Sequence, residues 1–188
     1  MLFRSHLPNV ICLARIALTV PAVLAIERGE QGLALALFTV AAVSDGLDGY
    51  LAKRNGWTSD LGRFLDPLAD KLLLVSVFLA CAWNGLLPVW LAAAAIARDL
   101  MIGGGALVYR LWFGPINGHP IVLSKVNTAL QIAVVVAALL AASVGWPPAG
   151  VQQALAVAML ATTAASGAAY VSIFFRRAWT ILGAAAAR

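Results

Sequence analysis

Four aspartates embedded in apolar sequence are the residues of this chain best suited to chemistry. Asp45 and Asp48 lie three positions apart, and Asp66 and Asp70 lie four positions apart. On a helix each pair shares one face, with Cβ atoms about 5 to 6 Å apart. A carboxylate inside a bilayer costs at least about 2.5 to 3.5 kcal/mol. A single aspartate could be a helix–helix hydrogen-bond partner or a proton relay, but four together indicate a bound ligand that offsets this cost.

The chemistry of the four side chains indicates hard divalent cations. Carboxylate oxygens with no imidazole or thiolate suit Mg²⁺ or Mn²⁺, and two such ions would balance four carboxylates. Two ions about 3.5 to 4 Å apart can hold phosphate oxygens for in-line displacement. The nearby Gly46, Gly49 and Gly62 fit either close helix packing or the close approach of a ligand to the backbone. We therefore expect phosphoryl chemistry at a two-metal site.

The composition requires a membrane to position these residues. Apolar residues make up 62% of the 188, and charged residues only 11%, against about 25% in soluble domains. One helical crossing needs about 20 residues. Six apolar runs approach this length: Leu7 to Ile26, Gln31 to Ala52, Leu61 to Ala82, Pro88 to Tyr109, Ile121 to Val144 and Val151 to Phe175. We expect an all-α, polytopic membrane protein: one catalytic domain over residues 1–188, built as a six-transmembrane-helix bundle, with 184–188 a frayed tail.

The basic residues set the expected topology. The chain has 13 lysines and arginines against 8 acids, a net charge of +5, which in a membrane protein indicates topology and anionic-lipid contact, not nucleic-acid binding. With the N-terminus inside, the cytoplasmic ends carry Arg4, Lys53, Arg54, Arg63, Arg110, Lys125, Arg176, Arg177 and Arg188, whereas only Arg28 falls outside. The six tryptophans fall mostly near the ends of the runs, as an aromatic belt does. We expect the termini and the aspartates on the cytoplasmic side of a bacterial inner membrane, with the mitochondrial inner membrane as the alternative.

A longer motif contains the aspartates. Residues 45–53 read DGLDGYLAK, and after eight positions residues 62–70 read GRFLDPLAD. This arrangement resembles the signature of the CDP-alcohol phosphatidyltransferases, Asp-x-x-Asp-Gly-x-x-Ala-Arg, a spacer, then Gly-x-x-x-Asp-x-x-x-Asp. Lys53 stands where that family usually has arginine, which keeps the charge but loses the bidentate fork.

The resemblance implies a six-helix membrane enzyme, commonly a homodimer, with two divalent cations and a CDP-linked substrate at the cytoplasmic leaflet. Carried over by position, Asp45, Asp48 and Asp66 would be metal ligands. Asp70 would be both a metal ligand and the general base. The nucleotide pocket would include Gly49 and Gly62, with either Lys53 or Arg54 contacting the pyrophosphate.

Further segments resemble the cardiolipin synthase branch of this family: LPN at 7–9, ARD at 97–99, LSKVNT at 123–128 and TTAAS at 162–166. Phosphatidylglycerophosphate synthases usually carry a second basic residue where Asn127 stands. One positive charge fewer suits a phosphodiester acceptor, phosphatidylglycerol, better than the monoester glycerol 3-phosphate. The expected acceptor-binding residues are Arg98, Lys125, Asn127 and Arg15. As alternatives, Arg98 could pair with an embedded acid, and Lys125 could extend from a helix end to the interface.

The expected reaction transfers the phosphatidyl group from CDP-diacylglycerol to phosphatidylglycerol and releases CMP. The first alternative is a phosphatidylglycerophosphate synthase that uses glycerol 3-phosphate. A small ion or proton transporter is a further alternative. It is less favoured because its ionisable groups should be spread through the midplane, whereas these carboxylates gather at one end.

Overall fold

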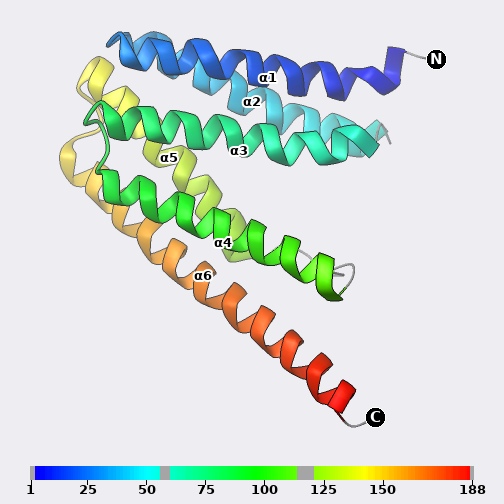
Figure 1. The fold of residues 1–188 in the computed structure, drawn as a ribbon. Coiled ribbons are helices and arrows are strands. Elements are labelled where there is room, and N and C mark those ends of the chain that lie inside the picture. Colours follow the sequence, from blue (N-terminus) through cyan, green and yellow to red (C-terminus); the bar gives the residue numbers. More distant parts are fainter. Residues whose placement is uncertain (1–2, 56–59, 114–120, 187–188) are drawn as a thin grey trace. The chain divides into compact units, whose positions relative to one another are not determined.

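The computed structural model describes the backbone of residues 3–55, 60–113 and 121–186, and the side chains of 13–44, 71–112, 121–173, 175 and 176. Every regular element in these ranges is a helix (Figure 1). The helices are α1 (Phe3–Glu27), α2 (Gln31–Asn55), α3 (Asp60–Trp83), α4 (Val89–Phe113), α5 (Val122–Val144) and α6 (Ala149–Ala186). Each overlaps one of the six predicted runs, so the all-helical expectation is confirmed.

Three of the helices are long and apolar enough to cross a bilayer: Val89–Trp112 in α4, Val122–Val144 in α5 and Ala149–Ile173 in α6. Shorter apolar segments occupy Gln31–Ser44 of α2 and Lys71–Trp83 of α3. This search covers only the described residues. The chain is therefore a helical protein with membrane-spanning helices, and the full count of six crossings stays a prediction.

Glycine ends three of the helices. Gly29, Gly85 and Gly145 follow α1, α3 and α5 with φ of 76°, 72° and 74°, a conformation that costs glycine no Cβ clash. After α1, the Gly29 amide donates to the Ile26 carbonyl at 3.1 Å and the Glu30 amide donates to the Ala25 carbonyl at 2.8 Å. These two bonds form a Schellman motif, which satisfies carbonyls that the helix end would otherwise leave free. Short connectors can therefore reverse the chain after each of these helices.

The chain divides into two compact units, and the first comprises residues 1–89 and 135–152. In it α1 packs along both α2 and α3 (Figure 1). Its largest fully buried side chains include Ile26, Phe38 and Phe78, and Leu139 of α5 is buried in the same unit. Buried alanines lie among them, and small residues of this kind let membrane helices pack closely. The buried alanines of α1 and α2 are Ala22, Ala25, Ala34 and Ala41.

The second unit comprises residues 90–134 and 153–188, which carry α4, the first part of α5 and most of α6. Gly167 of α6 lies against α4, since an added Cβ would be 3.2 Å from the Met101 Cε atom. Beside buried apolar residues such as Leu91 and Met159, this unit buries five polar side chains, which are Arg98, Asn127, Gln131, Thr163 and Ser166. Because buried polar groups require hydrogen-bond partners, this unit is the place to look for specific side-chain chemistry.

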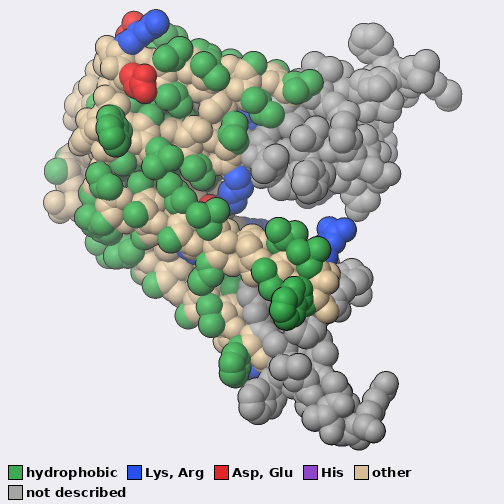
Figure 2. All heavy atoms as spheres, in the orientation of Figure 1, with side chains coloured by type: hydrophobic (Ala, Val, Ile, Leu, Met, Phe, Trp, Pro, Cys, Tyr) green, Lys and Arg blue, Asp and Glu red, His purple; other side chains and the backbone are tan. Residues whose placement is uncertain are grey.

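Large apolar side chains cover much of the exterior. On the face shown in Figure 2, hydrophobic side chains are spread over most of the described surface and charged ones are few. Leu100, Leu107 and Leu111 on α4 are all more than half exposed. The described tryptophans are exposed at or beside helix ends, and they are Trp83, Trp90, Trp112 and Trp146. An apolar exterior with tryptophans at the helix ends suits a lipid environment.

Candidate functional site

The predicted metal ligands lie on two helices of the first unit. Asp45 and Asp48 fall in the second half of α2, and Asp66 and Asp70 fall in the first half of α3. The backbone is helical at all four positions, as the spacing argument assumes. Their side chains lie outside the described residues, as do those of the predicted nucleotide-binding residues Gly49, Lys53, Arg54 and Gly62. The roles assigned to these eight residues therefore stay predictions.

In the part of the chain whose side chains are described, no group of three or more His, Cys, Asp or Glu could hold a metal ion. The four aspartates are not among the residues searched. As a donor set, four carboxylates fit Mg²⁺ or Mn²⁺, because both ions prefer oxygen ligands. The four aspartates thus suit the cations that the sequence predicts, and their role as ligands stays a prediction.

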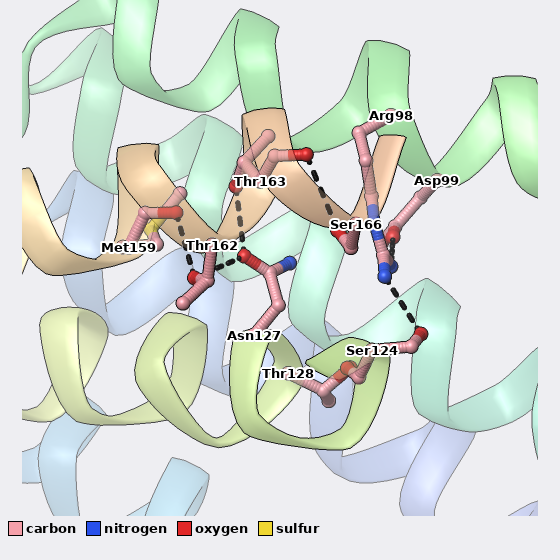
Figure 3. Close-up of polar contacts among 9 residues, drawn as sticks. All are labelled: Arg98, Asp99, Ser124, Asn127, Thr128, Met159, Thr162, Thr163 and Ser166. Carbon is pink, nitrogen blue, oxygen red and sulfur yellow. Dashed lines mark hydrogen bonds and ion pairs between the residues drawn. The ribbon is translucent and has the colours of Figure 1, made fainter. Parts of the chain in front are cut away.

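Seven of the described side chains form a polar cluster in the second unit (Figure 3). It joins α4, the first part of α5, and α6. We use the name polar cluster for Arg98 and Asp99 of α4, Ser124 and Asn127 of α5, and Thr162, Thr163 and Ser166 of α6. Its hydrogen bonds join the three helices to one another at the same point along their lengths.

Arg98 is the centre of one half of the polar cluster. Its Nε atom donates to the Ser166 hydroxyl at 3.0 Å, and Nη2 donates to the Ser124 hydroxyl at 2.6 Å. Nη1 donates to the Asp99 carboxylate at 2.8 Å, an ion pair between side chains that are 5% and 9% exposed. Arg98 therefore fixes one positive charge among three helices, with a carboxylate beside it. Each Nη atom also carries a second hydrogen.

Asn127 is the centre of the other half, and none of it is exposed. Its Oδ1 atom accepts hydrogen bonds from the hydroxyls of Thr163 at 2.8 Å and Thr162 at 2.9 Å. The Thr162 hydroxyl also lies within hydrogen-bond distance of the Ala158 and Met159 carbonyls, and its one hydrogen can serve only one acceptor at a time. Thr163 is therefore the residue that fixes the amide with its oxygen toward α6. Within the described structure, the Nδ2 atom of Asn127 has no partner.

The other predicted acceptor-binding residues lie elsewhere. Lys125 is exposed, whereas Asn127 two positions later is buried. Arg15 is buried on α1 of the first unit, where the Thr19 hydroxyl donates to its backbone carbonyl at 2.9 Å. The structure thus brings Arg98 and Asn127 into one cluster, and the acceptor-binding roles of Lys125 and Arg15 stay predictions.

The sequence interpretation missed Gln131, which lies one helical turn after Asn127. Its side chain is 1% exposed, and neither its Nε2 nor its Oε1 atom has a hydrogen-bond partner in the described structure. A lone glutamine in an apolar run resembles an ordinary helix–helix contact residue. The four-residue spacing from Asn127 was the available signal, because it puts both amides on one face of α5.

Comparisons with known proteins match nearly the whole chain. A family model described as CDP-alcohol phosphatidyltransferase matches residues 5–184. A cardiolipin synthase (CMP-forming) of Rattus norvegicus is 32% identical over 182 residues, which cover 87% of this chain and 60% of that protein. A cardiolipin synthase (CMP-forming) of Streptomyces coelicolor is 39% identical over 102 residues, or 51% of this chain and 47% of that protein.

A second activity is also named among the relatives. A CDP-diacylglycerol–glycerol-3-phosphate 3-phosphatidyltransferase of Bacillus subtilis is 34% identical over 151 residues, which cover 72% of this chain and 77% of that protein. The chain spans only about half the length of the first cardiolipin synthases it matches, 45% and 47%. The match to the family model covers both units and includes all four aspartates. On that match, the chain belongs to the CDP-alcohol phosphatidyltransferase family.

Proposed function

We propose that the protein is a cardiolipin synthase that transfers the phosphatidyl group of CDP-diacylglycerol to phosphatidylglycerol and releases CMP. Family membership supports phosphatidyl transfer in general. Relatives with both acceptor specificities match the chain, so the choice of acceptor needs a separate argument from the residues of this chain.

The observation that carries the choice is the charge of the polar cluster. Arg98 is paired with Asp99, Asn127 is neutral, and Lys125 is exposed outside the cluster. The charges of the pair cancel, so the cluster offers little net attraction for a dianion. Phosphatidylglycerol presents a phosphodiester with one negative charge, whereas glycerol 3-phosphate presents a monoester with a charge near two. The neutral cluster therefore favours the phosphodiester.

The predicted residues supply a direct displacement. Asp70 takes the proton of the glycerol hydroxyl of phosphatidylglycerol, and the hydroxyl oxygen forms a bond to the lipid-side phosphorus of CDP-diacylglycerol. The bond from that phosphorus to the CMP oxygen breaks at the same time, so no covalent enzyme intermediate is required. Gly49 and Gly62 leave room for the nucleotide beside the backbone, and Lys53 or Arg54 binds the pyrophosphate.

The same proposal assigns the cations to the four aspartates. Asp45, Asp48, Asp66 and Asp70 would hold two ions, Mg²⁺ or Mn²⁺. When bound, such ions neutralise negative charge on the pyrophosphate and on the departing CMP. The family match supports this assignment, because the matched range contains all four residues.

We further propose one catalytic domain with six crossings, acting as a homodimer with its site on the cytoplasmic side. The match to one family model across both units supports a single domain, and the three long apolar helices support an integral membrane protein. Relatives from a bacterium and from an animal fit either a bacterial inner membrane or a mitochondrial one. Family membership gives no support to the transporter alternative.

Identifying the product tests the proposal. The purified protein in lipid nanodiscs receives labelled CDP-diacylglycerol with either phosphatidylglycerol or glycerol 3-phosphate, each with and without Mg²⁺ or Mn²⁺. We expect cardiolipin and CMP from phosphatidylglycerol, only with the cation, and neither from an Asp70→Asn control. Phosphatidylglycerophosphate from glycerol 3-phosphate, with no cardiolipin, would instead establish the second activity named among the relatives.

A further inference from the structure

Among the described side chains of the second unit, the buried polar atoms that lack partners all belong to two neighbouring amides on α5. They are Nδ2 of Asn127 and both Nε2 and Oε1 of Gln131, on side chains that are 0% and 1% exposed. The two residues are four positions apart on one helix, so their side chains leave the same face about 5 to 6 Å apart. Buried polar groups in native proteins are almost always hydrogen-bonded. A pair of adjacent amides without partners therefore indicates a site for a polar ligand.

The hydrogen bond from Thr163 sets the orientation of the Asn127 amide. Thr163 holds the Oδ1 atom of Asn127 at 2.8 Å, which leaves Nδ2 as the atom offered to a ligand. In Figure 3 this nitrogen points away from Thr162 and toward the side on which Arg98 and Ser166 lie. Thr163 is thus a positioning residue for the Asn127 amide.

The available atoms select the chemical class of the ligand. The amide nitrogens of Asn127 and Gln131 donate hydrogen bonds, and the Gln131 oxygen accepts one. A phosphate or carboxylate oxygen only accepts, so it would leave the Gln131 oxygen without a partner, and an inorganic cation would not suit the nitrogens. A hydroxyl both donates and accepts. It alone among these groups can accept from the Asn127 nitrogen and donate to the Gln131 oxygen at the same time.

We propose that Asn127 and Gln131 bind the non-reacting secondary hydroxyl of the acceptor's glycerol headgroup. This inference rests on the proposed transfer to a glycerol-bearing acceptor. Phosphatidylglycerol and glycerol 3-phosphate both carry this hydroxyl beside the primary hydroxyl that reacts. An ordered water offers the same chemistry, so the experiment must separate the two sources.

Two deletions distinguish the acceptor's hydroxyl from an ordered water: removing the hydroxyl from the acceptor, and removing the amide from the protein. The rate constant kcat/KM is measured for phosphatidylglycerol and for phosphatidylpropane-1,3-diol, which lacks only the secondary hydroxyl. We expect the wild-type protein to prefer phosphatidylglycerol by about tenfold or more, since the analogue leaves buried amides unpaired. Gln131→Met, of similar shape but without the amide, should lose most of this preference. Gln153→Met, an exposed glutamine on α6, is the matched control and should keep it.

Equal kcat/KM for the two lipids in the wild-type protein would overturn the proposal, and this comparison needs no folded variant. An unchanged preference in Gln131→Met, with only its unfolding temperature altered, would also overturn it and would assign the amides to a structural water. If the protein uses only glycerol 3-phosphate, the proposed acceptor, phosphatidylglycerol, is wrong. The hydroxyl site is then tested by comparing kcat/KM for glycerol 3-phosphate with kcat/KM for 3-hydroxypropyl phosphate, which lacks the secondary hydroxyl. If neither acceptor reacts, the rise in unfolding temperature caused by each lipid is compared, and equal rises refute the site.

Discussion

Replacing Arg98 by methionine should destabilise the protein more than any exposed charge change. Methionine keeps much of the apolar stem of arginine but removes the bonds to Ser124, Ser166 and Asp99. Interhelical hydrogen bonds in membranes contribute about 0.6 kcal/mol on average and up to about 1.7, so the two serine bonds account for about 1 to 3 kcal/mol. Removing one partner of a buried ion pair costs about 3 to 5 kcal/mol. Since the Asp99 side chain is 9% exposed, the ion-pair cost lies near its lower value of about 3 kcal/mol, and with the two serine bonds we expect a total loss of about 4 to 6 kcal/mol.

The assay is the free energy of unfolding in mixed micelles, from a denaturing-detergent titration followed by circular dichroism. Arg110→Met is the matched control, because Arg110 is exposed in the last turn of the same helix and its favourable interaction with the helix end contributes less than about 1 kcal/mol. Adding Asp99→Asn to Arg98→Met should restore about 1 to 3 kcal/mol, because the carboxylate then no longer needs its cation. Equal losses for Arg98→Met and Arg110→Met would refute the argument that Arg98 joins the three helices.

Three further predictions concern turnover. Asp70→Asn should remain folded and bind CDP-diacylglycerol, but lower CMP release by about 100-fold or more, as loss of a general base does; near-normal turnover in a CMP-release assay would remove Asp70 from that role. Asn127→Lys should raise the KM for phosphatidylglycerol more than that for CDP-diacylglycerol, because it adds a charge to a neutral cluster; equal changes in both KM values would contradict the acceptor assignment. Removing divalent cations with EDTA should abolish CMP release, and Mg²⁺ or Mn²⁺ should restore it; full activity in EDTA would exclude the two-metal site.

The helices could be predicted because their signal is strong. A run of about 20 apolar residues bounded by charge, glycine or proline has few structural interpretations, and Gly29, Gly85 and Gly145 mark three of the ends. The end of α6 differs from the predicted span because a span length reports only apolar thickness. The predicted run stops at Phe175, whereas the helix continues through an alanine-rich segment to Ala186, since alanine strongly favours helix in any solvent.

The polar cluster could be predicted only in part. Arg98 was expected either to bind the acceptor or to pair with an embedded acid, and the structure shows a pair with the adjacent Asp99. Lys125 and Asn127 were each predicted to bind the acceptor. Two residues correspond to about 200° around a helix, so Lys125 is exposed and Asn127 buried, and their roles stay predictions. The partners of Asn127 on α6 depend on how two helices pack, which no local pattern specifies.

The length of α6 has a consequence outside the bilayer. Its 38 residues extend about 57 Å, nearly twice the roughly 30 Å of the hydrocarbon layer. The predicted apolar run ends at Phe175, so about 16 Å of helix continues beyond it to Ala186, starting at the exposed Arg176. We therefore expect a fluorophore attached at Ala186 to lie outside the acyl chains, where a quencher confined to those chains could not reach it.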